Sequence, residues 1–280
     1  MVEGKKKNTI QDFQRYKDEG KLWTWSICYD YTMAGIVDES KTEMILVGDS
    51  LGNVITGFGS TIPVTLDMMI HHIKAVVKGA PHTFIVGDMP FGTYNASNEQ
   101  AIMTANRIMQ EGGSDCVKLE GGANMAPRIR AIVDAGIPVM AHIGLTPQSA
   151  SAIGGMKLQG KAKAAADKLV EDALAVQEAG AFAVCLECMP SVVAHKICKT
   201  LRIPGAGIGA GPYCDGQELN LYDMTGLFGD FKPKFVKHFA ELRQPMVKAL
   251  DDFYDEVIAG TFPTPEFSYN AVPEGYEEWK

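Results

Sequence analysis

The chain has 280 residues, of which 46% are hydrophobic and 21% are charged. Composition of this kind is typical of a globular protein with a sizeable core, and the length suits one large α/β barrel domain. A formal net charge of −8 argues against a nucleic-acid-binding surface, which needs clustered lysine and arginine. The chain has no apolar run of the roughly 18 residues that a membrane span requires, and no apolar segment follows the N-terminal charges. We therefore expect a cytoplasmic protein without membrane or nucleic-acid partners.

Strand-like apolar runs alternate with helical patterns along the chain, an order that predicts a parallel sheet with helical crossovers. The expected strands are residues 23–29, 44–48, 83–87, 116–119, 138–141, 183–186, 205–208 and a short run at 224–228. Eight strands close a (β/α)8 TIM barrel. The expected helices are residues 10–19, 65–78, 124–135, 161–179 and one that begins at a Ser97–Gln100 capping box.

One domain is expected to span residues 1–280. Within it, we expect the helix at 10–19 to close the bottom of the barrel. Residues 1–8, which include three consecutive lysines, are expected to form a flexible tail, and residues 261–280 a C-terminal tail that packs on a neighbouring subunit or is loose.

Five of the expected strands end in residues with charged or reactive side chains: Asp49, Asp88, Glu120, His142 and Glu187. A β/α barrel gathers the carboxyl ends of its strands at one mouth, where its active site lies. Carboxylates that converge there repel one another, so a bound cation is their natural counter-charge. We therefore predict that Asp49, Asp88 and Glu120 bind a divalent cation such as Mg²⁺. The alternative for each aspartate is capping of a helix or loop.

Other candidates lie beside these acids. Lys118 points to the same side of its strand as Glu120 and is suited to binding a substrate carboxylate, or else forms a structural salt bridge in the barrel. Glu187 ends an apolar strand, where burial raises the proton affinity of a carboxylate and suits it to general-base work. His142 either orients that base, donates a hydrogen bond to an oxygen, or is an ordinary core residue. Ser50 directly follows Asp49.

Three further segments bear on function. Residues 144–160 have no sustained helical period but contain four glycines and a proline, which indicates a functional loop over the mouth. Cys185 and Cys188 form a C-x-x-C, but residues three apart on a strand face opposite sides, so we expect no shared metal or disulfide. The glycines of 207–211 have the wrong spacing for a dinucleotide-binding motif and indicate a close approach of the backbone to a ligand.

Seven segments together carry a family resemblance. They are Tyr29–Tyr31, Val47–Gly52, Gly87–Phe91, Val117–Gly122, His142–Ser149, Leu186–Cys188 and Gly207–Gly211. In this order, and over nearly the whole length from Ile10 to about Pro263, the chain resembles the ketopantoate hydroxymethyltransferase family. The segments around Lys118 and Thr146 are the most specific to it. Pro212–Cys214 departs from the usual pattern of the family.

The resemblance implies a (β/α)8 barrel of the phosphoenolpyruvate/pyruvate type in a homodecamer, with one Mg²⁺ per subunit. It implies transfer of a hydroxymethyl group from 5,10-methylenetetrahydrofolate to 3-methyl-2-oxobutanoate through a Mg-stabilised enolate. The products are 2-dehydropantoate and tetrahydrofolate, in pantothenate and coenzyme A biosynthesis. By motif match, the metal residues are Asp49, Asp88 and Glu120, the substrate-binding residues are Asp49, Ser50, Asp88 and Lys118, and the proton acceptor is Glu187.

Two alternatives stay open at this stage. A barrel of the phosphoenolpyruvate mutase and isocitrate lyase type also uses Mg²⁺ and the enolate of a 2-oxo acid, although the Lys-Cys-Gly loop of such enzymes is missing from this sequence. A metal-stabilised scaffold protein would leave the buried acids without a purpose, whereas perturbed acids cluster at functional sites.

Overall fold

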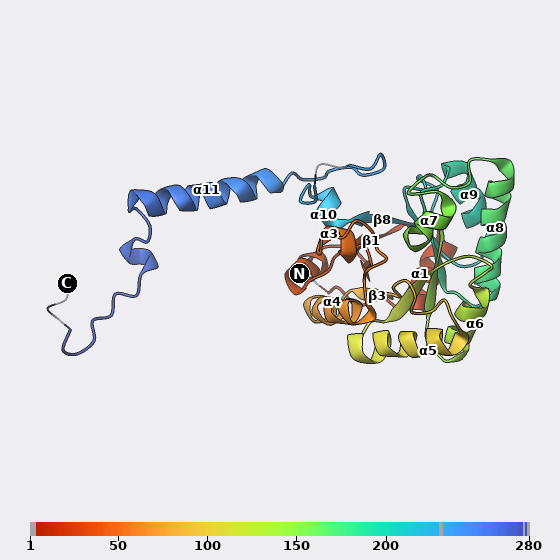
Figure 1. Ribbon diagram of the computed structural model, residues 1–280, viewed down its shortest axis with the longest axis horizontal. Helices are drawn as coiled ribbons and strands as arrows, with labels where there is room; N and C mark the ends of the chain where they lie inside the picture. Colours follow the sequence, from red (N-terminus) through yellow and green to blue (C-terminus); the bar gives the residue numbers. More distant parts are fainter. Residues whose placement is uncertain (1–3, 230–231, 277, 279–280) are drawn as a thin grey trace.

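The structure is a computed structural model that describes residues 4–229, 232–276 and 278. Eight parallel strands pair in chain order and close into a barrel, with helices around it (Figure 1). The strands are β1 (Trp23–Ile27), β2 (Met44–Val47), β3 (Phe84–Asp88), β4 (Cys116–Glu120), β5 (Val139–Gly144), β6 (Ala183–Glu187), β7 (Gly205–Ile208) and β8 (Gly216–Asn220). The predicted fold class is confirmed.

The eighth strand lies earlier in the chain than the sequence pattern indicated. We expected it at 224–228, where the structure has the end of a short helix, α10 (Leu221–Met224), and a turn. β8 instead pairs with β1 and places Glu218 and Asn220 at buried positions. Glutamate and asparagine are depleted in strands, so a strand with these residues on its inward face has no apolar signature.

The helices agree with the expected segments within two residues at most ends. Those around the barrel are α1 (Ile10–Glu19), α2 (Tyr31–Glu39), α3 (Leu51–Val54), α4 (Leu66–Gly79), α5 (Asn98–Arg107), α6 (Ala126–Asp134), α8 (Lys163–Glu178) and α9 (Ser191–Thr200). Ser97 caps α5 as predicted, since its side chain accepts a hydrogen bond from the Gln100 main-chain N–H at 3.1 Å. A π-helical turn, η1 (Ile108–Gly112), extends α5.

The N-terminal helix packs against the start of the barrel, as predicted. The Phe13 ring lies 4.8 Å from the Trp23 ring and 5.3 Å from the Phe84 ring, and these two residues begin β1 and β3. Lys5 and Lys7, which we placed in a flexible tail, contact the barrel. The Lys5 ammonium donates to Thr83 Oγ1 at 2.9 Å, and Lys7 Nζ lies 2.7 Å from Asp115 Oδ2.

The last helix, α11 (Arg243–Ala259), lies away from the barrel together with the C-terminal segment (Figure 1). All its side chains are exposed, including the large apolar Leu250, Phe253 and Ile258. No long helix follows β8 on the outer surface of the barrel within the described residues. A cavity of about 390 Å³ lies there instead, between α2, β1 and β8.

Candidate active site

A cavity of about 180 Å³ opens at the carboxyl ends of the barrel strands. The predicted site residues all line it: Asp49, Ser50, Asp88, Lys118, Glu120, His142 and Glu187. They come from five strands or from the residues just after them, and parallel closure of the barrel brings them together. Apolar side chains such as Ile27, Leu46 and Ile208 form the rest of the wall. The side chains at the carboxyl ends of these strands therefore meet in one cavity, as the sequence pattern predicted.

Lys118 is a buried cation among acids. Its side chain is 4% exposed, and its ammonium lies 2.8 Å from Asp88 Oδ1. Burial opposes its charge, but Asp88, Glu120 and Asp49 outweigh that cost and hold its pKa well above the ordinary value. Lys118 therefore stays charged, and it supplies the positive end of the cavity.

Asp49 and Asp88 lie close enough to affect each other's charge. The Asp49 main-chain N–H donates to Asp88 Oδ2 at 3.1 Å. Burial first, and then the neighbouring Asp88, raise the pKa of Asp49 to about 7. Burial also raises the pKa of Glu120 well above its usual range. Burial and mutual repulsion thus oppose full ionisation of these acids, with Lys118 as the one cation beside them among the residues that line the cavity.

Gln148 joins the acids and was not identified from the sequence as a site residue. Its Nε2 donates to Asp49 Oδ2 at 2.8 Å and to the Met89 carbonyl at 2.9 Å, while its main-chain N–H donates to Glu120 Oε2 at 2.9 Å. The Tyr94 hydroxyl donates to Gln148 Oε1. Gln148 could have been identified from the sequence, because it lies in the family-specific segment at the start of the long loop.

His142 lies between two of the acids. Its Nε2 is 3.0 Å from Glu187 Oε2, and its Nδ1 is 3.6 Å from Glu120 Oε1. Nδ1 is also 3.5 Å from the Lys118 ammonium. The Glu187 side chain is 16% exposed, so it faces the cavity while His142 supports it from the wall. This geometry fits the predicted pair of a base and its orienting histidine.

Ser50 is held by a chain of hydroxyl and amide groups. The hydroxyls of Ser50 and Tyr29 are 2.8 Å apart, and Asn220 Nδ2 donates to the Tyr29 hydroxyl at 2.8 Å. Tyr29 is fully buried and Asn220 is nearly so. The chain connects β8 to the loop after β2, and it fixes the position of the Ser50 hydroxyl at the mouth.

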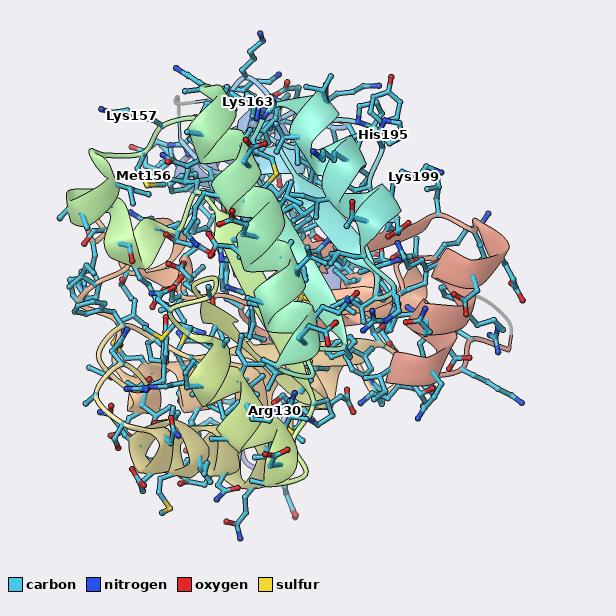
Figure 2. The ribbon with its side chains drawn as sticks, turned by 90° about the vertical axis from the view of Figure 1, so that its right-hand side faces the viewer. Arg130, Met156, Lys157, Lys163, His195 and Lys199 are labelled. Carbon is cyan, nitrogen blue, oxygen red and sulfur yellow. The ribbon has the colours of Figure 1, made fainter. Side chains whose placement is uncertain are left out.

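The loop at 144–160 lies over the mouth, as predicted, although it contains two short helices, η2 (Pro147–Ser149) and α7 (Ala150–Ile153). Pro147 and Met156 line the cavity. Figure 2 shows Met156 and Lys157 beside the end of α8 that Lys163 marks, with Arg130 toward the other end of that helix. The loop is therefore positioned to cover a bound ligand.

The carboxylates fit a hard divalent cation. Within residues 4–229, 232–276 and 278, no three histidine, cysteine or acidic side chains are close enough to hold an ion unaided. Mg²⁺ takes only one or two protein carboxylates and completes its shell with water and substrate oxygens. Asp49 and Asp88 supply such oxygens, and their mutual repulsion is what a cation would relieve.

The C-x-x-C forms no joint site. All six cysteines are free thiols. Cys185 points into the barrel, and Cys188 follows β6 in a left-handed conformation with φ of 46°. The alternation argument does not apply to this pair, because β6 ends at Glu187 and Cys188 lies just after it.

A profile of one protein family, described as ketopantoate hydroxymethyltransferase, matches residues 7–265. The chain belongs to this family. It is 54% identical over 269 residues to the 3-methyl-2-oxobutanoate hydroxymethyltransferase of Heliobacterium modesticaldum, covering 96% of this chain and 98% of the relative. It is 51% identical over 263 residues to the enzyme of that name from Clostridium beijerinckii, covering 94% and 96%. The resemblance read from the seven segments is confirmed, and the chain is a hydroxymethyltransferase.

Solved structures with a similar fold come from the rival group considered above. A phosphonopyruvate hydrolase complex with oxalate and Mg²⁺ aligns with a TM-score of 0.61 at 11% identity, over 94% of this chain and 92% of that one. A 2,3-dimethylmalate lyase of the phosphoenolpyruvate mutase/isocitrate lyase superfamily aligns at 0.56 and 15%, over 92% of each. At such identities the likeness establishes the barrel fold but not the reaction, which has to be argued from the site residues. No helix in the described part of the chain is long and apolar enough to cross a membrane.

Proposed function

We propose that the protein transfers the one-carbon unit of 5,10-methylenetetrahydrofolate to C3 of 3-methyl-2-oxobutanoate, giving 2-dehydropantoate and tetrahydrofolate for pantothenate and coenzyme A synthesis. The observation that carries the proposal is the convergence of Asp49, Asp88, Glu120 and Glu187 around one small cavity that also holds Lys118. A 2-oxo acid needs positive charge at its oxygens and a base near C3, and the cavity offers both.

Each residue has a distinct task in this scheme. Lys118 attracts the substrate carboxylate, and the Ser50 hydroxyl, fixed by Tyr29, donates a hydrogen bond to it. Glu187 takes the proton from C3, with His142 at 3.0 Å holding the carboxylate in place. The resulting carbanion equivalent forms the new C–C bond to the methylene carbon, and both C–N bonds of the methylene bridge break. Water supplies the hydroxyl group, and the C3 proton and the second proton of the water go to the two nitrogens of the departing tetrahydrofolate. Two substrates in one cavity gain much of their reactivity from proximity.

Asp49 and Asp88 are the residues that would hold Mg²⁺ directly, with Glu120 close beside them and with water and substrate oxygens completing the shell. When bound, the ion would supply Lewis-acid stabilisation for negative charge on the keto oxygen. Gln148 contributes by holding Asp49 and Glu120 in fixed orientations through its side-chain and main-chain hydrogen bonds.

We further propose that the protein is a homo-oligomer, with a decamer as the expected form. Support comes from the exposed apolar side chains of α11 and from the uncovered outer surface of β1 and β8, since a monomer would leave both in water. The six reduced cysteines are compatible with the cytoplasmic location that we propose.

The test is product formation. The purified protein is incubated with 3-methyl-2-oxobutanoate, 5,10-methylenetetrahydrofolate and Mg²⁺, and the products are identified by mass spectrometry. The proposal predicts 2-dehydropantoate in amounts equal to tetrahydrofolate, and no product after chelation of the ion. Cleavage of 2,3-dimethylmalate or isocitrate, without 2-dehydropantoate, would instead favour the chemistry of the structurally similar lyases.

A further inference from the structure

Glu218 is a buried acid on the floor of the active-site cavity, and the scheme above gives it no role. It belongs to β8, whose backbone pairs it with Trp25, and its side chain lines the cavity. In a β/α barrel the inward side chains of alternate strands form layers of four. Leu46, Lys118, Cys185 and Glu218 come from β2, β4, β6 and β8, and all four line this cavity. Glu218 therefore faces the same space as Lys118 from the opposite strand.

The Glu218 carboxyl group lacks the partners that a buried acid needs. The residue is 4% exposed. Its Oε2 is 4.0 Å from the Cys185 thiol, a weak donor, and its Oε1 has no hydrogen-bond partner among the described residues. Burial raises the pKa of this carboxyl group well above the usual range, which favours the protonated form that can donate a hydrogen bond. Because buried polar groups are nearly always hydrogen-bonded, an unpaired one at the floor of a cavity indicates a ligand with a polar atom at that position.

The proposed substrate does not supply such an atom at its far end. The carboxylate of 3-methyl-2-oxobutanoate faces Lys118 in the scheme above, and its opposite end is an isopropyl group. The proposed product differs, because 2-dehydropantoate has a hydroxyl on C4. A 4-hydroxyl group can both accept the proton of a neutral carboxyl and donate to its other oxygen.

Resting on the proposed function, we propose that Glu218 is a specificity-determining residue that hydrogen-bonds the 4-hydroxyl group of 4-hydroxy-2-oxo acids. The site then prefers this class over acids of the same shape that end in a methyl group. Such discrimination is characteristic of sites with a built-in polar partner, since the isosteric analogue leaves the buried group unpaired.

Two acids of nearly equal size test the idea. 4-Hydroxy-2-oxobutanoate and 2-oxopentanoate differ only by a hydroxyl in place of a terminal methyl group. Their dissociation constants are measured by calorimetry on the full-length protein with Mg²⁺. We expect the hydroxy acid to bind about tenfold more tightly, the effect of one good hydrogen bond. In Glu218→Leu the preference should disappear, whereas Glu218→Gln, which keeps a donor and an acceptor, should retain most of it.

Control variants distinguish a failure of the proposed role of Glu218 from a failure of the proposed reaction. Glu171→Gln, an exposed glutamate on α8, should keep the wild-type preference, and Glu218→Met serves if Glu218→Leu does not fold. Equal binding of the two acids by the wild type, or an unchanged preference in the folded leucine or methionine variant, would overturn the role of Glu218. That outcome, with 2-dehydropantoate still formed, leaves the proposed reaction intact. Absence of 2-dehydropantoate refutes the reaction itself.

Discussion

Replacing Gln148 with leucine removes three hydrogen bonds from the centre of the site while keeping a side chain of similar size. The lost bonds are those from Nε2 to Asp49 and to the Met89 carbonyl, and the one that Oε1 accepts from Tyr94. The main-chain bond to Glu120 remains. Asp49 and Tyr94 are 4% and 1% exposed, so the lost bonds are poorly replaced.

The size of the effect follows from the partners. A hydrogen bond to a carboxylate contributes about 2 kcal/mol and each of the two neutral bonds about 1 kcal/mol, for a total of about 4 kcal/mol. In a chain of this size, that loss corresponds to a drop in Tm of roughly 8–16 °C. Because Asp49 also loses its fixed orientation, we expect weaker Mg²⁺ binding in the same variant.

Urea unfolding followed by circular dichroism measures the first effect, and calorimetric titration with Mg²⁺ measures the second. The matched control is Gln159→Leu in the same loop, whose side chain makes one exposed hydrogen bond to the Lys157 carbonyl. The control should lose less than about 0.5 kcal/mol. If Gln148→Leu is as stable as Gln159→Leu and binds Mg²⁺ equally well, Gln148 does not organise the site.

Three other perturbations have defined outcomes. Lys118→Met leaves Asp88 buried without its cation and should lower the free energy of unfolding by about 3–5 kcal/mol in urea titrations; an unchanged midpoint would contradict the buried ion pair. Tyr29→Phe removes the hydroxyl that contacts Ser50 and Asn220. The free energy of unfolding should fall by about 2 kcal/mol, and KM for the 2-oxo acid should rise. An unchanged KM would argue against Ser50 as a substrate contact. Glu218 has a raised native-state pKa, so native protein holds its proton at pH values where the unfolded chain has released it. Stability should therefore fall as pH rises above about 4.3, by up to ~1.4 kcal/mol per pH unit from this group. Glu218→Gln should flatten that fall between pH 5 and 8 relative to wild type, and parallel stability curves would show that Glu218 ionises freely.

The strands and the main site residues could be predicted because their pattern is local. Seven strands are apolar runs, and residues such as Asp88 and Glu187 stand at strand ends, where barrel closure alone determines that they meet. No knowledge of packing is needed for this step. The side-chain alternation that placed Lys118 beside Glu120 is equally local.

The features that could not be predicted from the sequence depend on contacts across the barrel. β8 has polar residues on its inward face, so its burial follows from pairing with β1 rather than from its own hydrophobicity. Gln148 becomes a site residue only because the loop after β5 folds back over β2 and β4. Glu218 was missed with the strand that contains it, although it lies on the floor of the cavity.

In the proposed reaction, Glu187 removes the C3 proton of a 2-oxo acid bound among Asp49, Asp88 and Lys118. Its most direct test is deuterium exchange at C3 of 3-methyl-2-oxobutanoate in D₂O, followed by NMR without any folate. Wild-type protein with Mg²⁺ should exchange the proton, and Glu187→Gln should do so about 10²–10⁴-fold more slowly while unfolding at a similar temperature. Exchange at the wild-type rate in Glu187→Gln would show that Glu187 is not the base.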